Sequence, residues 1–479
     1  MLEQIDQIIK VIDGAVWGLP LIILILFTGF LLTTRLGLLQ IRHLGKALKF
    51  MFKNEEDGQG EVTSFGALCT ALSATIGTGN ITGVATALAA GGPGALFWMV
   101  IAAFFGMATK YAEGLLAIKY RTIDKDGHVL GGPFYYIENG MGKNWRWLAK
   151  IFAFFGAGVG LFGIGTFTQV NSISSAVKNF FDPESSNVVF SAFGHDYTMA
   201  TVVTGLILTL CVGLVVIGGI KRIAKVSEIV VPFMAVLYVA LGAIIIITNI
   251  TAVPAALVSI IKSAFTGSAL AGGAMGTMVV AMQKGIARGI FSNESGLGSA
   301  PLVAAAAKTK NPVRQALISS TGTFWDTVVV CLITGVTLVT TIMKNPDINM
   351  SSIQNGGQMT TAAFSQIPVL GSIILVFGII TFAYTTVLGW SYYGERCAEY
   401  LFGKRATIFF KIIFVFVILL GPVIELDIVW SLSDIFNALM AIPNIIALVF
   451  TSGLIAKETK KWLNNLEGTD DTEIPTLDK

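Results

Sequence analysis

Long apolar runs alternate with short charged segments along nearly the whole chain. About 20 consecutive apolar residues are enough for a helix to cross the hydrocarbon core of a bilayer. Eleven such runs cover approximately residues 15–34, 63–90, 94–119, 148–177, 198–217, 228–248, 266–290, 313–342, 369–396, 407–424 and 430–455. The pattern predicts an all-α polytopic membrane protein with eleven transmembrane helices.

The second run is interrupted near its centre by Thr75-Ile76-Gly77-Thr78-Gly79-Asn80. Glycines weaken a helix, and Thr and Asn side chains offer the backbone other partners. We therefore expect a broken helix near mid-membrane, with free N–H groups at one half-helix end and free C=O groups at the other. Such ends suit a carboxylate and a small cation, respectively. A helix-packing face of small residues is the alternative, but packing does not explain Asn80.

A second glycine cluster, Gly272-Gly273-Ala274-Met275-Gly276-Thr277, lies in the seventh run, five runs after the first break. Broken helices in corresponding positions of two halves indicate an inverted-repeat transporter. The segment Phe291–Gly298, after this run, is expected on the cytoplasmic side.

The predicted organisation has four parts. These are an extra N-terminal helix with an amphipathic cytoplasmic segment (1–62), a first five-helix repeat broken near 77–80 (63–250), a second half broken near 272–278 (251–424, with the last helix running to 456), and a polar cytoplasmic tail (457–479), expected to be disordered.

The distribution of charge sets the expected orientation. Only 13% of the residues are charged and 54% are hydrophobic, whereas soluble proteins carry about twice that charged fraction. Lysine and arginine gather in alternate loops, beginning with the loop after the first run, which places those loops in the cytoplasm. The N-terminus is then outside, the C-terminus is cytoplasmic, and the location is the plasma or inner cell membrane. The acidic N-terminus also lacks the basic start of a cleaved signal peptide.

Several function classes are disfavoured. The four cysteines are scattered over separate runs and the three histidines lie in loops, so neither a disulfide framework nor an intramembrane metal centre is expected. The GxG at Gly77 has no surrounding βαβ pattern. With no activated nucleophile and no phosphate loop, we expect neither an enzyme nor a cofactor, and no nucleic acid or obligatory protein partner.

A few polar residues within the runs are candidates for binding. Gln169 is a neutral amide deep in a run, and Thr385 and Thr386 supply oxygens that suit Na⁺. Trp390 follows Thr386 by one helical turn. A structural role in helix packing or interhelical hydrogen bonding explains these residues about as well as a binding role does. Asp326 is an acid deep in a run, either a proton site or a partner of binding residues.

The chain resembles the alanine or glycine:cation symporter family of the amino acid/polyamine/organocation superfamily. The resemblance rests on Ala74–Ile81, Gly91–Met99, Phe105–Glu113, Phe291–Pro301 and Val387–Glu395. It implies the leucine-transporter-type fold, with ten helices in two inverted repeats, preceded here by one extra helix. It also implies Na⁺-coupled uptake of small neutral amino acids such as alanine and glycine, with glutamine in some members.

The resemblance also implies roles for individual residues. Thr78, Gly79 and Asn80 hold the substrate carboxylate, Gln169 and Thr386 bind its polar groups, Phe167 and Trp390 limit its size, and Gly276 and Thr277 are the expected contacts from the second break. The sodium site uses carbonyls around Ala74 and Gly77 with the hydroxyls of Thr385 or Thr386.

Two other functions remain open at this stage. A proton-coupled carrier of the same architecture would use Asp326 as its relay. An ion channel would use the same broken helix without coupling.

Overall fold

The computed structural model describes residues 2–55, 58–163, 165–192, 195–266, 278–345, 356–367, 370–423, 427–470 and 472–477. Its elements, in chain order, are α1 (Leu2–Val16), α2 (Leu19–Arg35), α3 (Leu39–Arg42), α4 (Leu44–Met51), α5 (Ser64–Thr75), η1 (Thr78–Asn80), α6 (Thr82–Gly91), α7 (Gly94–Lys119), β1 (Thr122–Ile123), β2 (Val129–Leu130), α8 (Pro133–Tyr136), η2 (Ile137–Met141), η3 (Lys143–Trp145), α9 (Arg146–Phe162), α10 (Phe167–Phe181), β3 (Val188–Ala192), β4 (His195–Thr198), α11 (Met199–Val216), α12 (Gly219–Thr248), η4 (Ile250–Ala252), α13 (Val253–Thr266), α14 (Met278–Asn293), α15 (Pro301–Ala304), α16 (Pro312–Thr323), η5 (Phe324–Cys331), α17 (Leu332–Lys344), α18 (Gly356–Phe364), α19 (Leu370–Phe402), α20 (Ala406–Leu420) and α21 (Asp427–Trp462).

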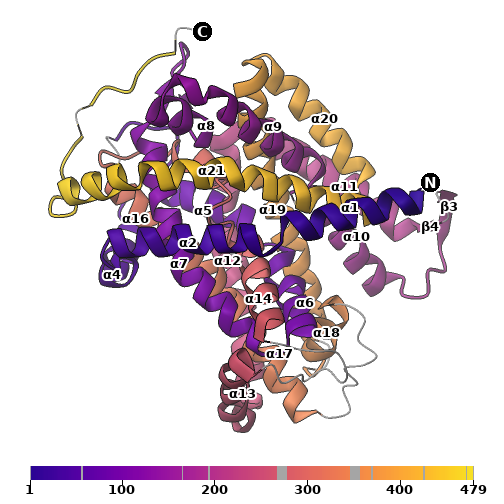
Figure 1. The fold of residues 1–479 in the computed structure, drawn as a ribbon. Helices are drawn as coiled ribbons and strands as arrows, with labels where there is room; N and C mark the ends of the chain where they lie inside the picture. The colour runs from indigo at the N-terminus through magenta and orange to yellow at the C-terminus, as the bar shows by residue number, and fades with distance from the viewer. Residues whose placement is uncertain are drawn as a thin grey trace.

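The predicted helical membrane protein is confirmed in its broad features. Within the described residues, eight helices are long and apolar enough to cross a membrane, and several shorter apolar helices, including α5, α6 and α20, accompany them. Figure 1 shows α5, α12 and α19 near the middle of the bundle, with the long α21 running beside α1 and α2. The two antiparallel strand pairs, β1–β2 and β3–β4, are short hairpins between helices.

The helix α14 ends at Asn293, past the end of the predicted seventh run at 266–290. A Cβ atom on Gly285 would lie 2.1 Å from the carbonyl oxygen of Ala95, and one on Gly91 would lie 3.1 Å from Cα of Ala281. The first half of α14 therefore packs on the turn between α6 and α7, which is at the predicted extracellular end. The predicted break at 272–278 lies outside the described residues, apart from Met278, where α14 begins.

This position corrects the cytoplasmic placement of the segment that follows α14. Ser292, Asn293, Glu294 and Ser295 are each at most 2% exposed and lie in the core of the bundle. Lys284 and Arg288 precede them on the half of α14 that packs at the predicted extracellular end, so in this orientation the two residues do not belong to the cytoplasmic loops. Their basic charge misled the sequence-based assignment.

Main-chain pairing closes the predicted cytoplasmic end of the bundle. The segment that leads into α5 lies along the segment after α15, with Glu61 N–H donating to Ala306 O at 2.8 Å and Lys308 N–H donating to Val62 O at 2.7 Å. The guanidinium of Arg121 donates to the carbonyls of Ala305 and Ala307 at 3.2 and 3.0 Å. We refer to this pairing of 59–62 with 306–309 as the inner strand pair.

The C-terminal tail is ordered in the described residues, which corrects the expectation of disorder. Ile123 of β1 pairs with Thr476, as Ile123 N–H donates to Pro475 O at 2.9 Å and Leu477 N–H donates to Ile123 O at 2.8 Å. Asp470 N–H donates to Lys310 O at 2.7 Å. The tail therefore covers the inner strand pair from the predicted cytoplasmic side and links it to β1.

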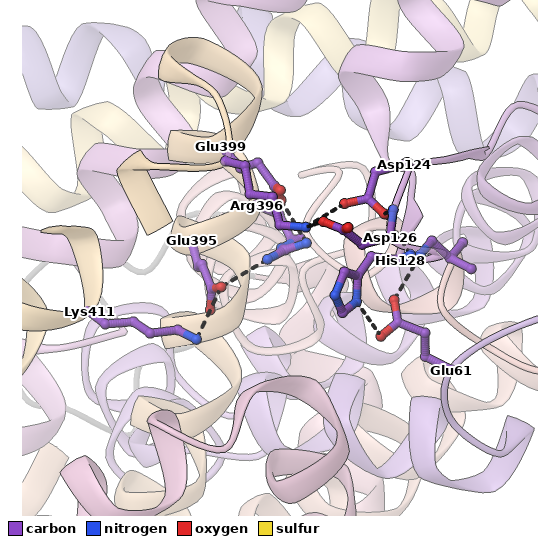
Figure 2. A network of polar contacts seen from close by, with 10 residues as sticks. Glu61, Asp124, Asp126, His128, Glu395, Arg396, Glu399 and Lys411 are labelled. Atoms are coloured by element: carbon purple, nitrogen blue, oxygen red, sulfur yellow. Dashed lines mark hydrogen bonds and ion pairs between the residues drawn. The ribbon is translucent and has the colours of Figure 1, made fainter. Parts of the chain in front are cut away.

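Charged side chains extend this cap, at the predicted cytoplasmic end, to the end of α19, as Figure 2 shows. Arg396 bridges Glu395 and Glu399 at 2.8 and 2.6 Å, while Lys404 contacts Asp124 and Asp126 in the β1–β2 turn. Partial burial opposes ionisation of Asp124, but hydrogen bonds from Lys404 and from the His128 N–H outweigh it, so the pKa of Asp124 lies below its usual value. On the other side of this turn, His128 contacts Glu61, which precedes α5.

We expect single cysteines at Glu184, in the loop before β3, and at Asn464, in the tail, to label from opposite sides of the membrane. Both side chains are exposed, and the positive-inside rule puts the tail in the cytoplasm. In a background with Cys211 replaced, an impermeant maleimide should label Glu184→Cys in intact cells and Asn464→Cys only after permeabilisation. The reverse pattern would invert the predicted orientation.

Candidate functional site

The first break lies between α5 and α6, as the sequence predicts. The helix α5 ends at Thr75, Gly77 has an extended backbone, and the turn η1 leads into α6. A Cβ atom on Gly77 would lie 2.6 Å from Oγ1 of Thr386. A glycine is therefore needed here for the close approach of α19, not for an unusual backbone angle.

The side chain of Asn80 holds this break together. Its Oδ1 accepts a hydrogen bond from Gly77 N–H at 2.8 Å, and its Nδ2 donates to Oδ1 of Asp326 at 2.7 Å. Asn80 is fully buried. Both the oxygen and the nitrogen of the Asn80 amide thus have partners within the protein, although the neighbouring Gly79 lines the cavity described below.

A second break lies between α14 and α15. Glu294, Gly296 and Gly298 have φ angles of 55°, 91° and 80°, in the region that favours glycine. Glu113 of α7 stabilises the irregular backbone, because its Oε1 accepts hydrogen bonds from Gly296 N–H and Gly298 N–H, both at 3.1 Å. Asn444 of α21 donates to the same oxygen at 2.7 Å.

The carboxylate of Asp326 joins the two breaks. It lies in the π-helical segment η5, accepts from Asn80 of the first break, and accepts from Ser292 Oγ, next to the second break, at 2.9 Å. Thr327 Oγ1 donates to it at 2.7 Å. Asp326 is fully buried, and such π-helical segments are frequent at functional sites.

A small cavity lies where the breaks meet. It is lined by both breaks, α10 and α19, through Ala74, Thr75, Gly77, Gly79, Gln169, Phe291, Ser292, Glu294, Thr386 and Trp390. Its volume is about 10 Å³, which is room for about one water molecule. The cavity must therefore widen to admit a larger ligand.

A much larger vestibule leads toward this cavity from the predicted extracellular side. It has a volume of about 850 Å³ and lies between α6, α10, α18 and α19. Its lining includes Thr78 and Thr82 from the first break and polar residues of α10 such as Asn171 and Ser175. At the opposite, predicted cytoplasmic end, the described residues are closed by the inner strand pair.

The structure brings some of the sequence-predicted residues to the cavity and separates others from it. Gln169 accepts a hydrogen bond from Thr78 N–H at 3.4 Å, and Thr386 Oγ1 lies 3.5 Å from Ile76 O. Thr385 instead lies against Met234 of α12, with Oγ1 at 3.6 Å from Sδ. Phe167 is buried at the start of α10 and stacks on Phe162. Gly276 and Thr277 lie outside the described residues.

Glu294 is a cavity residue that sequence reasoning missed. Its Oε1 accepts from Trp390 Nε1 at 3.0 Å and its Oε2 accepts from Ser299 Oγ at 2.5 Å. The signal was present, since two glycines separated by one residue stand next to polar residues here, as Gly77 and Gly79 do in the first break. The basic residues of α14 concealed it, because they suggested a cytoplasmic position.

The cavity lies in a region with more acidic than basic side chains. Lys110 of α7 is 3% exposed, and its charge acts on three buried carboxylates, those of Glu113, Glu294 and Asp326. An excess of carboxylates in a region shielded from water favours an additional cation.

A membrane-spanning helical bundle with two broken helices that meet at a polar cavity, open to one side through a vestibule, defines a membrane transporter. The chain matches the profile of the sodium:alanine symporter family over residues 2–475. It is 47% identical over 460 residues to the sodium/alanine symporter AgcS of Methanococcus maripaludis, covering 95% of this chain and 97% of that protein. The protein described here therefore belongs to the sodium:alanine symporter family, and it is a transporter and not an enzyme.

Two further similarities define the breadth of the family and the fold. The probable sodium/glutamine symporter GlnT of Bacillus subtilis is 35% identical over 466 residues, covering 96% of this chain and 91% of that protein. The crystal structure of MhsT in complex with L-phenylalanine aligns with a TM-score of 0.57 at 13% identity, covering 83% of this chain and 98% of that chain. This last match shows the leucine-transporter-type fold.

Replacement of Asn80 by alanine should disrupt the first break. It removes the bonds to Gly77 N–H and Asp326 and leaves buried polar groups without partners, at a cost of about 1–3 kcal/mol each. We expect a lower unfolding temperature in detergent. Thr70→Ala is the matched control, because among the described residues the single hydrogen bond of Thr70 Oγ1 is to Gly66 O of its own helix. An Asn80→Ala variant that behaves like this control would contradict the assigned role.

Proposed function

We propose that this chain is a sodium-coupled symporter that imports small neutral amino acids, alanine and glycine first, by alternating access. The observation that carries the proposal is the meeting of two broken helices at a polar cavity beneath an outward vestibule. Broken-helix ends provide sites for both a carboxylate and a cation. A relative named as a sodium/alanine symporter and another named as a probable sodium/glutamine symporter support this substrate class.

The proposed architecture keeps eleven spans in the predicted cell membrane, with the N-terminus outside and the C-terminus in the cytoplasm. The pair α5–α6, the pair α14–α15 and α20 would each add a span to the eight long helices. We retain one extra helix within 1–62, the two inverted repeats at 63–250 and 251–424, a last helix to about 456 and the tail. The break of the second repeat is proposed at Glu294–Ala300. No cofactor beyond Na⁺ and no protein partner are required.

The substrate is proposed to lie between the two breaks. The α-carboxylate is proposed at the main-chain N–H groups of Thr78, Gly79 and Asn80, just before the N-terminal end of α6, where the helix dipole favours an anion. The N–H groups of Thr78 and Asn80 donate to Gln169 Oε1 and Gly77 O in this state and would exchange these partners for the carboxylate. Glu294 on the opposite wall supplies a negative charge for the ammonium group. Trp390 and Phe291 are the bulky walls of a cavity that holds only about one water molecule in this state. Alanine or glycine demands less widening than leucine, which favours small side chains.

The sodium site is proposed beside the same break, with Thr386 Oγ1 and the carbonyls around Ala74 and Gly77 as ligands. Hydroxyl and carbonyl oxygens suit a hard cation. Thr386 Oγ1 is directed at the break, whereas Thr385 Oγ1 is directed at α12. We therefore propose Thr386 as the ligand of this pair.

The transport cycle then follows from the two ends of the bundle. With the vestibule open and the inner strand pair closed, Na⁺ and the amino acid bind from outside. Inward release requires the outer path to close and 59–62 to separate from 306–309. Because each ligand favours the same closed arrangement of the breaks, their binding is mutually coupled.

A proton-coupled carrier is the second candidate, and the position of Asp326 favours it. This carboxylate touches both breaks, so a change in its charge would act on both. A relay must take up a proton during the cycle, and protonation would weaken the hydrogen bonds that Asp326 accepts from Asn80 and Ser292.

Uptake of radiolabelled alanine into proteoliposomes decides between these candidates. We expect accumulation only with an inward Na⁺ gradient, with competition by glycine and glutamine but not by leucine. Accumulation that persists without Na⁺ and collapses with a proton uncoupler would transfer the coupling role to Asp326. Passive, non-saturable flux would indicate a channel.

The sodium assignment has an internal control in two neighbouring threonines. Thr386→Val removes the hydroxyl directed at the break, and we expect the Na⁺ concentration for half-maximal uptake to rise about tenfold, the equivalent of roughly 1.4 kcal/mol. Thr385→Val should change it less than twofold. Equal effects of the two substitutions, or a larger effect of Thr385→Val, would show that the site lies elsewhere.

A further inference from the structure

A second charged cavity lies on the far side of Phe291 from the proposed substrate cavity. It has a volume of about 160 Å³ and is formed by α1, α14 and α21. Phe291 lines both cavities, with the guanidinium of Arg288 lying 5.4 Å from its ring centre. Nothing in the proposed transport cycle uses this second cavity.

The cavity presents two acidic and two basic side chains to the same space. Asp13 comes from α1, Asp434 from α21, and Lys284 and Arg288 from α14. Their charges act on one another, but among the described residues none of the four forms a salt bridge with another member of the set. Oδ1 of Asp13 is buried and accepts no hydrogen bond within the described structure. The four charged side chains thus line the cavity, and Oδ1 of Asp13 is left to accept a hydrogen bond from a bound ligand.

The aromatic wall of this cavity is held in place by the last long helix. Trp17, at the junction of α1 and α2, donates from Nε1 to the carbonyl of Asp434 at 2.9 Å. The bond fixes α1 against α21 and sets the separation of the two carboxylates. The cavity is therefore built by contacts between helices that are distant in the sequence.

Helix lengths place the cavity at the level of the lipid headgroups. Asp13 and Asp434 precede the cytoplasmic residues Arg35 and Lys457 by on the order of 30 Å of helix, which is the thickness of the hydrocarbon core. Below the cavity, Ile23, Phe27 and Phe30 of α2 are 60%, 52% and 54% exposed at helical spacing. This exposed stripe is a surface for acyl chains.

We propose that this cavity binds the headgroup of an aminophospholipid in the leaflet at that end of the bundle. Lys284 and Arg288 bind the phosphate, because guanidinium and ammonium groups donate strong hydrogen bonds to phosphate oxygens. Asp13 and Asp434 bind the primary ammonium. The bound lipid braces α14, and with it Ser292 and the second break, against α1 and α21. The required chemistry is that of a zwitterion, which an amino acid substrate shares, so the test separates the two sources.

Native mass spectrometry of the purified chain, supplied with lipids of identical acyl chains, tests the proposal. We expect one phosphatidylethanolamine retained per chain, with about tenfold preference over phosphatidylcholine. N-methyl and N,N-dimethyl headgroups should be retained at intermediate levels, since methylation removes N–H donors and keeps the charge. Equal retention across this series would overturn the proposal. The readout is lipid retention, so it is independent of the proposed transport activity.

Variants distinguish the two halves of the headgroup. Asp13→Asn with Asp434→Asn should abolish the preference for ethanolamine over choline, and Lys284→Gln with Arg288→Gln should remove retention of both lipids. Lys178→Gln, at the predicted extracellular end of α10, is the matched control and should change neither. Asp13→Asn alone, on the peripheral α1, provides the test if the double variants fail to fold. Retention unchanged in all variants would overturn the proposal.

Equilibrium dialysis of alanine against the protein in phosphatidylcholine nanodiscs tests whether an amino acid, and not a lipid headgroup, occupies this cavity. We expect no more than one alanine bound per chain, with no change in the Asp13→Asn variant. A second bound alanine that Asp13→Asn removes would assign the cavity to the amino acid and overturn the lipid proposal.

Discussion

The organisation of the bundle depends on one buried carboxylate. Asp326 accepts hydrogen bonds from Asn80, which holds the first break, and from Ser292, which immediately precedes the second. Breaks in two helices expose main-chain groups that must find partners inside the protein. A single acid that bonds to both breaks sets their separation, and this separation determines the dimensions of the cavity between them. The cost of burying the charge is offset by three directed hydrogen bonds and by the nearby Lys110.

The first break was predictable because its signal is local. Glycines, threonines and an asparagine in the middle of an apolar run leave few alternatives, and the structure places the irregular backbone at Gly77–Asn80. The second break carries a similar signal at Glu294–Gly298, but two basic residues precede it on α14. The positive-inside rule treats basic residues as cytoplasmic, whereas Lys284 and Arg288 lie at the predicted extracellular end and line a charged cavity with Asp13 and Asp434. The positive-inside rule therefore led to a cytoplasmic placement of Phe291–Gly298, although this segment contains the glycines of the second break.

Individual side-chain directions were less accessible from the sequence. Thr385 and Thr386 are adjacent in the chain, and only the rotation of α19 relative to α5 decides which hydroxyl is directed at the break. Glu294 became visible as a cavity residue only with the position of α14. The tail was expected to be disordered on composition, but composition does not register main-chain hydrogen bonds, and the tail is held by pairing with β1 and with the segment near Lys310.

The inner strand pair closes one end of the bundle through main-chain hydrogen bonds, and this limits which substitutions can change how readily that end opens. Main-chain hydrogen bonds between 59–62 and 306–309 are available to almost any sequence that keeps the two segments extended. Here, however, the two segments are packed too closely for most substitutions, since a Cβ atom on Gly60 would lie 2.4 Å from the carbonyl oxygen of Ala307, and Ala306 and Ala307 are fully buried. The rate at which the gate opens must instead be adjusted by the few side chains that hold the seam from outside, such as Arg121 and the pair of Glu55 and Arg314. Natural variation in turnover among relatives should therefore concentrate at such peripheral clamps and not along the seam itself.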